Sequence, residues 1–179
     1  GGMEWSYGIP GSIGGATYIN AGAFEKSIGD FIVSVKILEN GRIYWIKDFS
    51  FGYRTSSFKN SNKIILAIRI KLNLSTYTDI ERQQLEYIKR KKDTQPYGEY
   101  SAGSVFKRII KSDETFYPAK IIDNLGLKGV RIGGAEVSTK HAGFIVNIGN
   151  ARAKDVLRLI RHLKKRVKKA TGEKLEEEI

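Results

Sequence analysis

The stretch from Arg152 to Lys169 constrains the fold of this chain most. Its apolar residues, Val156, Leu159 and Leu163 among them, recur at the three- and four-residue spacing of one helix face. A helix with a single apolar stripe must bury that stripe against a second layer, so we expect a packed domain around it. The basic residues of the stretch then form the opposite face: Arg158, Arg161, Lys164, Lys165, Arg166, Lys168 and Lys169.

The formal net charge of the chain, +12, is concentrated on this predicted helix. An excess of positive charge attracts polyanions, so a basic nucleic-acid-binding module is one candidate function. The plainer interpretation is a solvated helix face, because no aromatic side chain is interleaved with the cations to stack on bases. We therefore expect no nucleic-acid partner, and keep the nucleic-acid-binding module as the alternative.

Composition excludes several kinds of site. The chain has no cysteine and two histidines, which rules out disulfides and thiolate metal sites and argues against a zinc site. No stretch is long and apolar enough to span a bilayer, and the first residues lack a signal-peptide pattern. We expect a cytoplasmic protein without metal or membrane partner.

The first half of the chain reads mainly as strands. Residues 31–38 and 42–46 are rich in β-branched and aromatic residues, and the Glu39-Asn40-Gly41 turn between them is typical of a hairpin. Residues 63–72 predict another strand. From 78 to about 92 the apolar spacing changes to that of a helix, and the proline at position 96 lies beyond its end.

The composition shifts at residues 95–100, and we place a domain boundary there, with one domain at 1–96 and a second at 97–179. In the second domain the pattern predicts a helix at 118–125, short strands near 130, 136–137 and 144–147, and a final strand at 174–179. Helices and strands in mixed order predict the α+β class.

A glycine-dense segment, residues 8–16, is the first candidate for a ligand site. Glycines let backbone amides approach an anion, and a helix start after them would add its positive end. The segment is neither a Walker loop nor a dinucleotide fingerprint. A ligand loop and a tight structural turn both fit it.

Three other groups could act on a ligand. Ser104 follows a run of small residues and could be a nucleophile or a proton donor, but the two histidines give no support for a Ser-His-Asp triad. Arg54 lies among aromatic and small polar residues, where a guanidinium can grip a carboxylate or phosphate; an ordinary surface arginine is the alternative. The acidic run 176–178 reads, by itself, as a solvated tail.

Together these segments resemble UDP-N-acetylenolpyruvoylglucosamine reductases over essentially the whole chain, in the same order. Five motifs carry the resemblance: the flavin-contacting segment at 8–16 with Asn20-Ala21-Gly22, the Tyr-Arg motif at 51–58, the Ala-Gly-Ser-Val-Phe motif at 101–107, the last-third motifs at 126–147, and the closing Leu-Glu-Glu-Glu-Ile at 175–179.

The resemblance implies a flavoenzyme that uses FAD and NADPH to reduce the enolpyruvyl group of UDP-N-acetylglucosamine enolpyruvate. It assigns three catalytic residues: Arg54 beside the substrate carboxylate, Ser104 as proton donor and Glu178 as its assistant. Tyr53 and Lys107 would bind the substrate. The residues implied to contact FAD are Gly8, Ile9, Pro10, Gly11, Ser12, Gly14, Gly15 and Ala16.

By the same resemblance, residues 1–96 are the remainder of a flavin-binding α+β domain and 97–179 a smaller α+β substrate-binding domain. The family's amino-terminal FAD lobe has no counterpart here, so we expect it as a partner, in the same or a separate chain. The short spacing from Arg54 to Ser104 resembles the shorter, second subtype. The family's closing proline is replaced by Glu177. Another flavoenzyme of this architecture is a further alternative.

Overall fold

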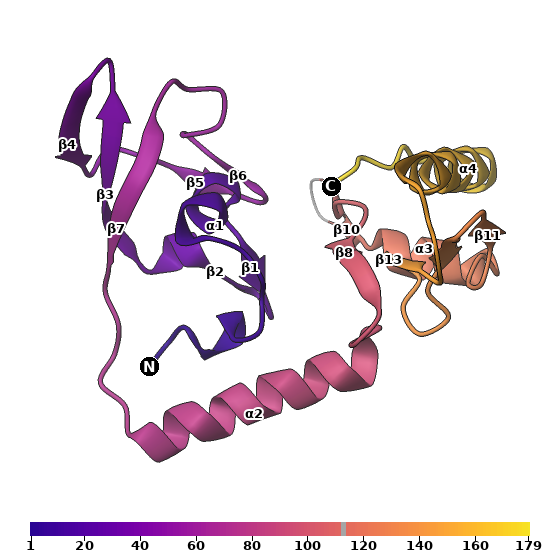
Figure 1. Ribbon diagram of the computed structural model, residues 1–179, viewed down its shortest axis with the longest axis horizontal. Helices are drawn as coiled ribbons and strands as arrows, with labels where there is room; N and C mark the ends of the chain where they lie inside the picture. The colour runs from indigo at the N-terminus through magenta and orange to yellow at the C-terminus, as the bar shows by residue number, and fades with distance from the viewer. Residues whose placement is uncertain (112–113) are drawn as a thin grey trace. The chain divides into compact units, whose positions relative to one another are not determined.

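The computed structural model describes residues 1–111 and 114–179, and the chain divides into two compact units, Gly1–Arg90 and Lys91–Ile179 (Figure 1). The division falls inside helix α2, Tyr77–Thr94. The boundary expected from composition, between residues 96 and 97, lies just after this helix. Each unit contains both helices and strands, and the predicted α+β class is confirmed.

The centre of the first unit is an antiparallel sheet of order β4-β3-β7, formed by Arg42–Ile46, Ile32–Glu39 and Ile64–Ile70. The predicted hairpin between β3 and β4 is present. Asn40 and Gly41 have positive φ values of 50° and 75°, as the turn of a tight hairpin requires. The strand predicted at 63–72 is present as β7, which begins at Ile64 and ends at Ile70.

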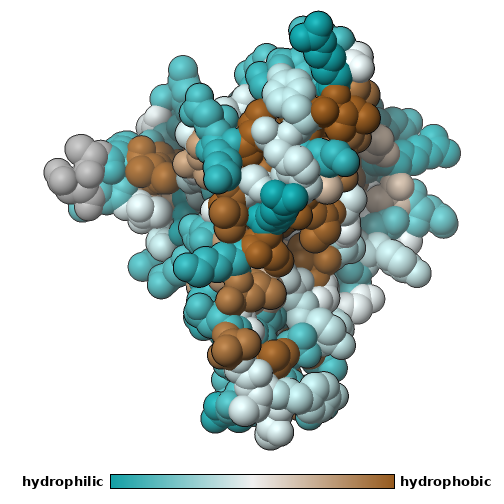
Figure 2. All heavy atoms as spheres, turned by 90° about the vertical axis from the view of Figure 1, so that its left-hand side faces the viewer, coloured by the Kyte–Doolittle hydropathy of each residue, from teal (hydrophilic) through white to brown (hydrophobic). Residues whose placement is uncertain are grey.

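One face of this sheet carries the core of the first unit. Val35, Ile37 and Phe58 are buried there, and the rings of Phe49 and Phe51 pack beside Phe58. Apolar side chains remain exposed on the strands as well, and Figure 2 shows such side chains on the face of the molecule where the sheet lies. The Phe51–Phe58 segment is therefore anchored by its aromatic residues to the sheet.

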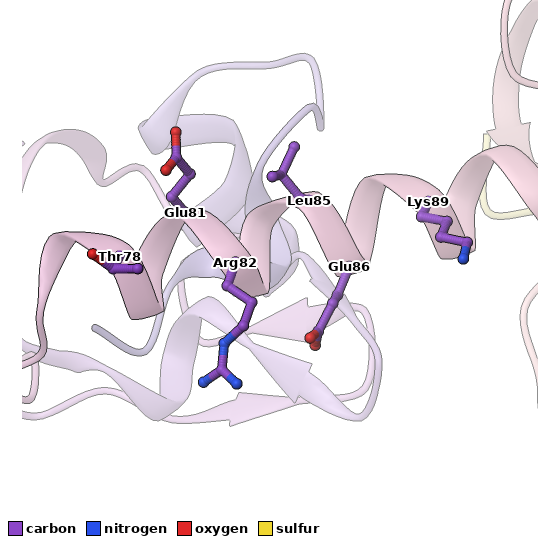
Figure 3. A pocket seen from close by; sticks show the side chains of 6 residues that line it. All are labelled: Thr78, Glu81, Arg82, Leu85, Glu86 and Lys89. Atoms are coloured by element: carbon purple, nitrogen blue, oxygen red, sulfur yellow. The ribbon is translucent and has the colours of Figure 1, made fainter.

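The other elements of the first unit are short. Helix α1, Ile13–Ile19, contacts β7. Helix α2 has a shallow hollow of ≈ 340 Å³ on its surface (Figure 3), lined by side chains of that one helix, and none of them is a predicted site residue. The remaining elements are η1 Glu4–Ser6, β1 Gly22–Ala23, β2 Lys26–Ser27, η2 Ile28–Asp30, β5 Phe51–Gly52 and β6 Thr55–Ser56.

The second unit is built on an antiparallel sheet of four strands, β11 Arg131–Ile132, β12 Ala135–Val137, β13 Phe144–Asn147 and β8 Tyr100–Ser104, in that order. Helix α4, Ala153–Thr171, packs its apolar stripe into the core beside this sheet, which confirms the predicted amphipathic helix. The remaining elements are β9 Ile109–Ile110, β10 Thr115–Phe116 and α3 Pro118–Asn124.

The last residues differ from the expected strand at 174–179. They form a single antiparallel bridge, between Phe106 and Glu177, with one main-chain hydrogen bond on each side of it. Leu175 is buried in the core just before this bridge. Among the described residues, no helix has both the length and the apolar character needed to cross a membrane.

The stripe of α4 predicts which of its leucines stabilises the second unit. Leu163 is 1% exposed in the core, whereas Leu157 is 50% exposed on the same helix. We expect Leu163→Ala to lower the free energy of unfolding by about 2–5 kcal/mol, because it removes buried methyl groups and leaves a cavity. Leu157→Ala should change it by about 0.5 kcal/mol or less. Urea titration of both variants tests this, and equal losses would contradict the packing described.

Candidate functional site

The glycine-dense segment of the first unit lines a cavity of ≈ 420 Å³. The walls are mostly apolar, and Trp5 forms part of them with an indole N–H that has no acceptor among the described residues. Such a lining suits a flat ring system better than a phosphate. The lining residues are Met3, Trp5, Ser6, Ile9, Pro10, Gly11, Ser12, Ile13, Gly15, Ala16, Ile19, Ala21 and Ile28.

Two glycines give the segment its course along this cavity. Gly8 and Gly11 have φ values of 75° and 144°, and no atom would lie within 4 Å of a Cβ at either position. Glycine is thus required there by backbone conformation and not by crowding. The segment can present its main chain to a ligand without a side chain in the way.

The start of α1 is held by a side-chain cap. Ser12 caps the helix, and its Oγ accepts a hydrogen bond from the Gly15 amide at 3.1 Å. The helix has seven residues, from Ile13 to Ile19. The cap therefore uses one amide of the first turn, and the segment also forms part of the apolar wall of the cavity.

The end of α1 is fixed to the Tyr-Arg segment by Asn20. This residue is 7% exposed and adopts the left-handed conformation, with φ 50°. Its Nδ2 donates to the Gly52 carbonyl oxygen at 2.9 Å, and its Oδ1 accepts from the Gly29 amide at 3.0 Å. A second bond nearby, from Ser56 Oγ to the Tyr18 carbonyl oxygen at 2.6 Å, joins the same two segments.

Arg54 lies in the two-residue turn between β5 and β6. It has φ 54°, a left-handed conformation that an arginine adopts only at an energetic cost and that is frequent at functional positions. Its Nη2 donates to the Gly22 carbonyl oxygen at 2.9 Å, and its guanidinium lies 5.2 Å from the centre of the Tyr53 ring. The turn thus holds Arg54 beside Gly22, the first residue of β1.

In the second unit, Ser104 is the last residue of β8 and is exposed. The residue after it, Val105, accepts a main-chain hydrogen bond from the Glu178 amide at 2.8 Å. The bridge between Phe106 and Glu177 continues this pairing. Two predicted catalytic residues far apart in the sequence, Ser104 and Glu178, therefore lie on adjacent extended segments.

The acidic run at the end of the chain is not a solvated tail, in contrast to the expectation from sequence alone. Glu176 forms an ion pair with Lys107, and both carboxylate oxygens of Glu177 lie 2.8 Å from Lys164 Nζ. The Lys164 contact lowers the pKa of Glu177 below its usual value. Lys107, a predicted substrate residue, thus already holds a carboxylate.

His141 belongs to the last-third motifs and is half-buried. Burial lowers the pKa of its imidazole below the ordinary value, which favours the neutral form at neutral pH. Its Nδ1 accepts a hydrogen bond from the Gly143 amide at 3.1 Å, and its ring lies 4.9 Å from that of Phe144. These contacts give it a role in shaping its own loop.

The structure brings the predicted residues together in two groups. Arg54, Tyr53 and the glycine-dense segment belong to the first unit, and Ser104, Lys107 and Glu178 belong to the second. Within residues 1–111 and 114–179, no group of three or more His, Asp or Glu side chains is arranged to hold a metal ion.

The sequence analysis missed two contributors. Trp5 lies before the glycine-dense segment and gave no periodic signal, so its place in the cavity wall was not expected. Asn20 was noted within a motif, but its role was not. An asparagine at the end of a short helix is a known signal for a left-handed cap.

Substitution of Asn20 measures how much its hydrogen bonds to Gly52 and Gly29 stabilise the first unit. We expect Asn20→Ala to lower the free energy of unfolding by about 2–4 kcal/mol, because two partly buried main-chain partners lose their bonds and alanine disfavours positive φ. Asn20→Gly loses the same bonds but tolerates the conformation, so it should be less destabilising by about 1 kcal/mol. Urea titration distinguishes them, and losses below about 0.5 kcal/mol in both variants would contradict the role described.

Comparison with known proteins places these segments in context. Residues 95–179 match the family model for the UDP-N-acetylenolpyruvoylglucosamine reductase C-terminal domain. The UDP-N-acetylenolpyruvoylglucosamine reductase of Thermotoga petrophila is 48% identical over 100% of this chain and 63% of its own length. That of Fervidobacterium nodosum is 44% identical over 99% of this chain and 58% of its own length.

A solved structure agrees with the sequence comparison. The crystal structure of UDP-N-acetylenolpyruvylglucosamine reductase from Thermus caldophilus superimposes with a TM-score of 0.82 at 35% identity, covering 99% of this chain and 63% of that one. The chain thus spans about 63% of the length of the Thermotoga petrophila relative and of this structure. Over almost its whole length the chain is therefore similar to UDP-N-acetylenolpyruvoylglucosamine reductases, and residues 95–179 match the C-terminal domain of that family.

Proposed function

We propose that this chain is the substrate-handling part of a UDP-N-acetylmuramate dehydrogenase, which reduces UDP-N-acetylglucosamine enolpyruvate with electrons from NADPH through FAD. One observation carries the proposal. Arg54 is held in a left-handed turn by the Gly22 carbonyl oxygen, at the end of the segment that lines the apolar cavity. A fixed cation beside a site for a flat ring suits the reduction of a substrate that bears a carboxylate.

The cavity of the first unit fits the ring system of a flavin. Its walls are mostly apolar, the Trp5 N–H in one of them has no acceptor within residues 1–111 and 114–179, and Gly8 and Gly11 leave the main chain uncovered. Gly8, Ile9, Pro10, Gly11, Ser12, Gly14, Gly15 and Ala16 would contact FAD. When bound, FAD accepts a hydride from NADPH and passes it to the enolpyruvyl group.

Arg54 would bind the carboxylate of the enolpyruvyl group. As hydride arrives at the vinyl carbon, negative charge moves toward this carboxylate, and a guanidinium already in place stabilises it without reorganisation. Tyr53 would contact the substrate beside Arg54, with its ring fixed by the guanidinium. The strain stored in the turn is consistent with a residue positioned for function.

Ser104 would give a proton to the carbon next to the reduced position, and Glu178 would assist it. A serine hydroxyl is a weak acid, so the acceptor must be a strong base such as the enolate-like carbon formed here. Pairing of Glu178 with the residue next to Ser104 supports this assignment. Lys107 would bind the substrate diphosphate by exchanging its partner Glu176, a small cost for an ion pair at the surface.

The remaining expectations follow from this activity. The part of the relatives' length that this chain does not span would supply the amino-terminal FAD lobe, in the same or a separate chain. The substrate and both cofactors are anionic, so the charge of +12 would favour their approach. We place the reaction, a step of peptidoglycan precursor synthesis, in the cytoplasm.

A flavin titration tests the proposal. We expect this chain, combined with the amino-terminal lobe, to shift the visible absorbance of FAD. NADPH should then bleach the flavin, and the enolpyruvyl sugar should restore its colour. A folded combination that binds no flavin, or a reduced flavin that the sugar does not reoxidise, would contradict it.

Ser104→Ala in this complete enzyme separates the two half-reactions. We expect flavin reduction by NADPH to be unchanged and reoxidation by the sugar to fall about 100-fold or more, because only the second step needs the proton. Ser101→Ala on the same strand serves as control and should leave both steps intact. Equal loss of both steps, or of neither, would refute the assignment of Ser104.

Arg54→Lys tests the carboxylate contact. We expect kcat/KM for the sugar to fall about 100-fold, because lysine keeps the charge but loses the planar fork, while flavin reduction by NADPH is unchanged. Arg42→Lys, at the exposed start of β4, is the matched control and should leave kcat/KM unaltered. Similar values for the two variants would contradict the role of Arg54.

A further inference from the structure

The closing segment has little secondary structure of its own. Its pairing is a single antiparallel bridge between Phe106 and Glu177, with one main-chain hydrogen bond on each side. Glu178 is the residue next to this bridge, so any further contact that holds Glu177 also bears on the position of Glu178.

The pairing of this segment with residues 105–107 does not use the main-chain N–H of Glu177. The two hydrogen bonds that flank the bridge run from Lys107 N to Glu176 O at 2.9 Å and from Glu178 N to Val105 O at 2.8 Å. Phe106 and Glu177 are therefore a pair without bonds between their own main chains. A proline fits such a position without loss of a pairing bond, which makes Glu177→Pro a usable variant here.

Glu177 reaches helix α4 instead. Both of its carboxylate oxygens lie 2.8 Å from Lys164 Nζ. Lys164 follows Leu163, which is 1% exposed in the core, so the cation stands on a firmly packed part of the helix. Side chains alternate along an extended segment, and Glu176 and Glu178 therefore leave it on the side opposite to Glu177.

The charge state of the pair is suited to this contact. Hydrogen bonding to Lys164 lowers the pKa of Glu177, so the carboxylate is charged at neutral pH. The side chains of Lys164 and Glu177 are 38% and 36% exposed. A pair this open to water contributes modestly to stability, and its effect is local to the segment that it ties.

We propose that the ion pair between Lys164 and Glu177 positions Glu178 by holding the closing segment against helix α4. Lys164 and Glu177 are positioning residues, because they touch the substrate at no point of the proposed reaction. The inference rests on the proposed function for the role of Glu178. The tie between the closing segment and α4 is independent of that function.

The test uses the complete enzyme with Lys164→Met, Glu177→Gln, and Glu177→Pro in the Lys164→Met background. Hydrogen exchange of the Glu178 amide reports the tie, and single-turnover reoxidation of the reduced flavin by the enolpyruvyl sugar reports its effect on the reaction. The control, Asp123→Asn, breaks a comparable surface pair with Lys128, 2.7 Å long, outside the closing segment.

We expect Lys164→Met and Glu177→Gln each to raise exchange of the Glu178 amide and to slow reoxidation by about two- to fivefold. KM for the sugar and reduction by NADPH should stay unchanged, as they should in Asp123→Asn. The added proline should restore both altered rates to within about twofold, which loss of a merely stabilising contact would not predict.

Two results would overturn the inference. Unchanged exchange in Lys164→Met and Glu177→Gln would show that the pair does not hold the segment. Faster exchange with unaltered reoxidation would show a tie without a positioning role. Absence of sugar-dependent reoxidation in the parent enzyme is a different failure: it refutes the proposed function and, with it, the positioning role, while the exchange data still decide the tie.

Discussion

The two hydrogen bonds of Asn20 are the contact on which the site of the first unit depends. They join the end of α1, the Gly29 amide and the Gly52 carbonyl oxygen, three points that no single secondary-structure element connects. Because α1 has seven residues, its own hydrogen bonds cannot fix its direction. The bonds from Ser56 Oγ to the Tyr18 carbonyl oxygen and from Arg54 to the Gly22 carbonyl oxygen add to this link between the cavity wall and the turn that carries Arg54.

The second unit relies on a longer chain of support. The apolar stripe of α4 packs against the core, and the basic face of the same helix then supplies Lys164 to the closing segment. That segment pairs with residues 105–107, next to Ser104. Burial, an ion pair and main-chain pairing thus act in sequence, and the weakest of these, the surface ion pair, lies nearest to the candidate catalytic residues.

The sequence predicted best where periodicity and turn chemistry agree. The hairpin around Asn40, helix α2 and the helix at Ala153–Thr171 were located to within two residues of their ends, since each combines a clear repeat with a terminating signal. The two-residue strands β5 and β6 were missed. They contain no repeat, and tertiary hydrogen bonds to Tyr18 and Gly22 hold their segment in place.

The candidate site could be predicted only in part. A motif shows which residues are present, but it does not show their backbone conformation or their partners in the folded chain. The motif containing Arg54 was found from its residues, but its left-handed backbone was not, since arginine carries no local preference for that conformation. The glutamates at 176–178 were misjudged for the converse reason. An acidic run looks solvated when only its own sequence is considered. The fold shows that Lys107, three residues after β8, pairs with Glu176, and that Lys164 of α4 pairs with Glu177. Charge in a sequence therefore indicates what a segment can pair with, whereas the partner is decided by packing that brings distant elements together.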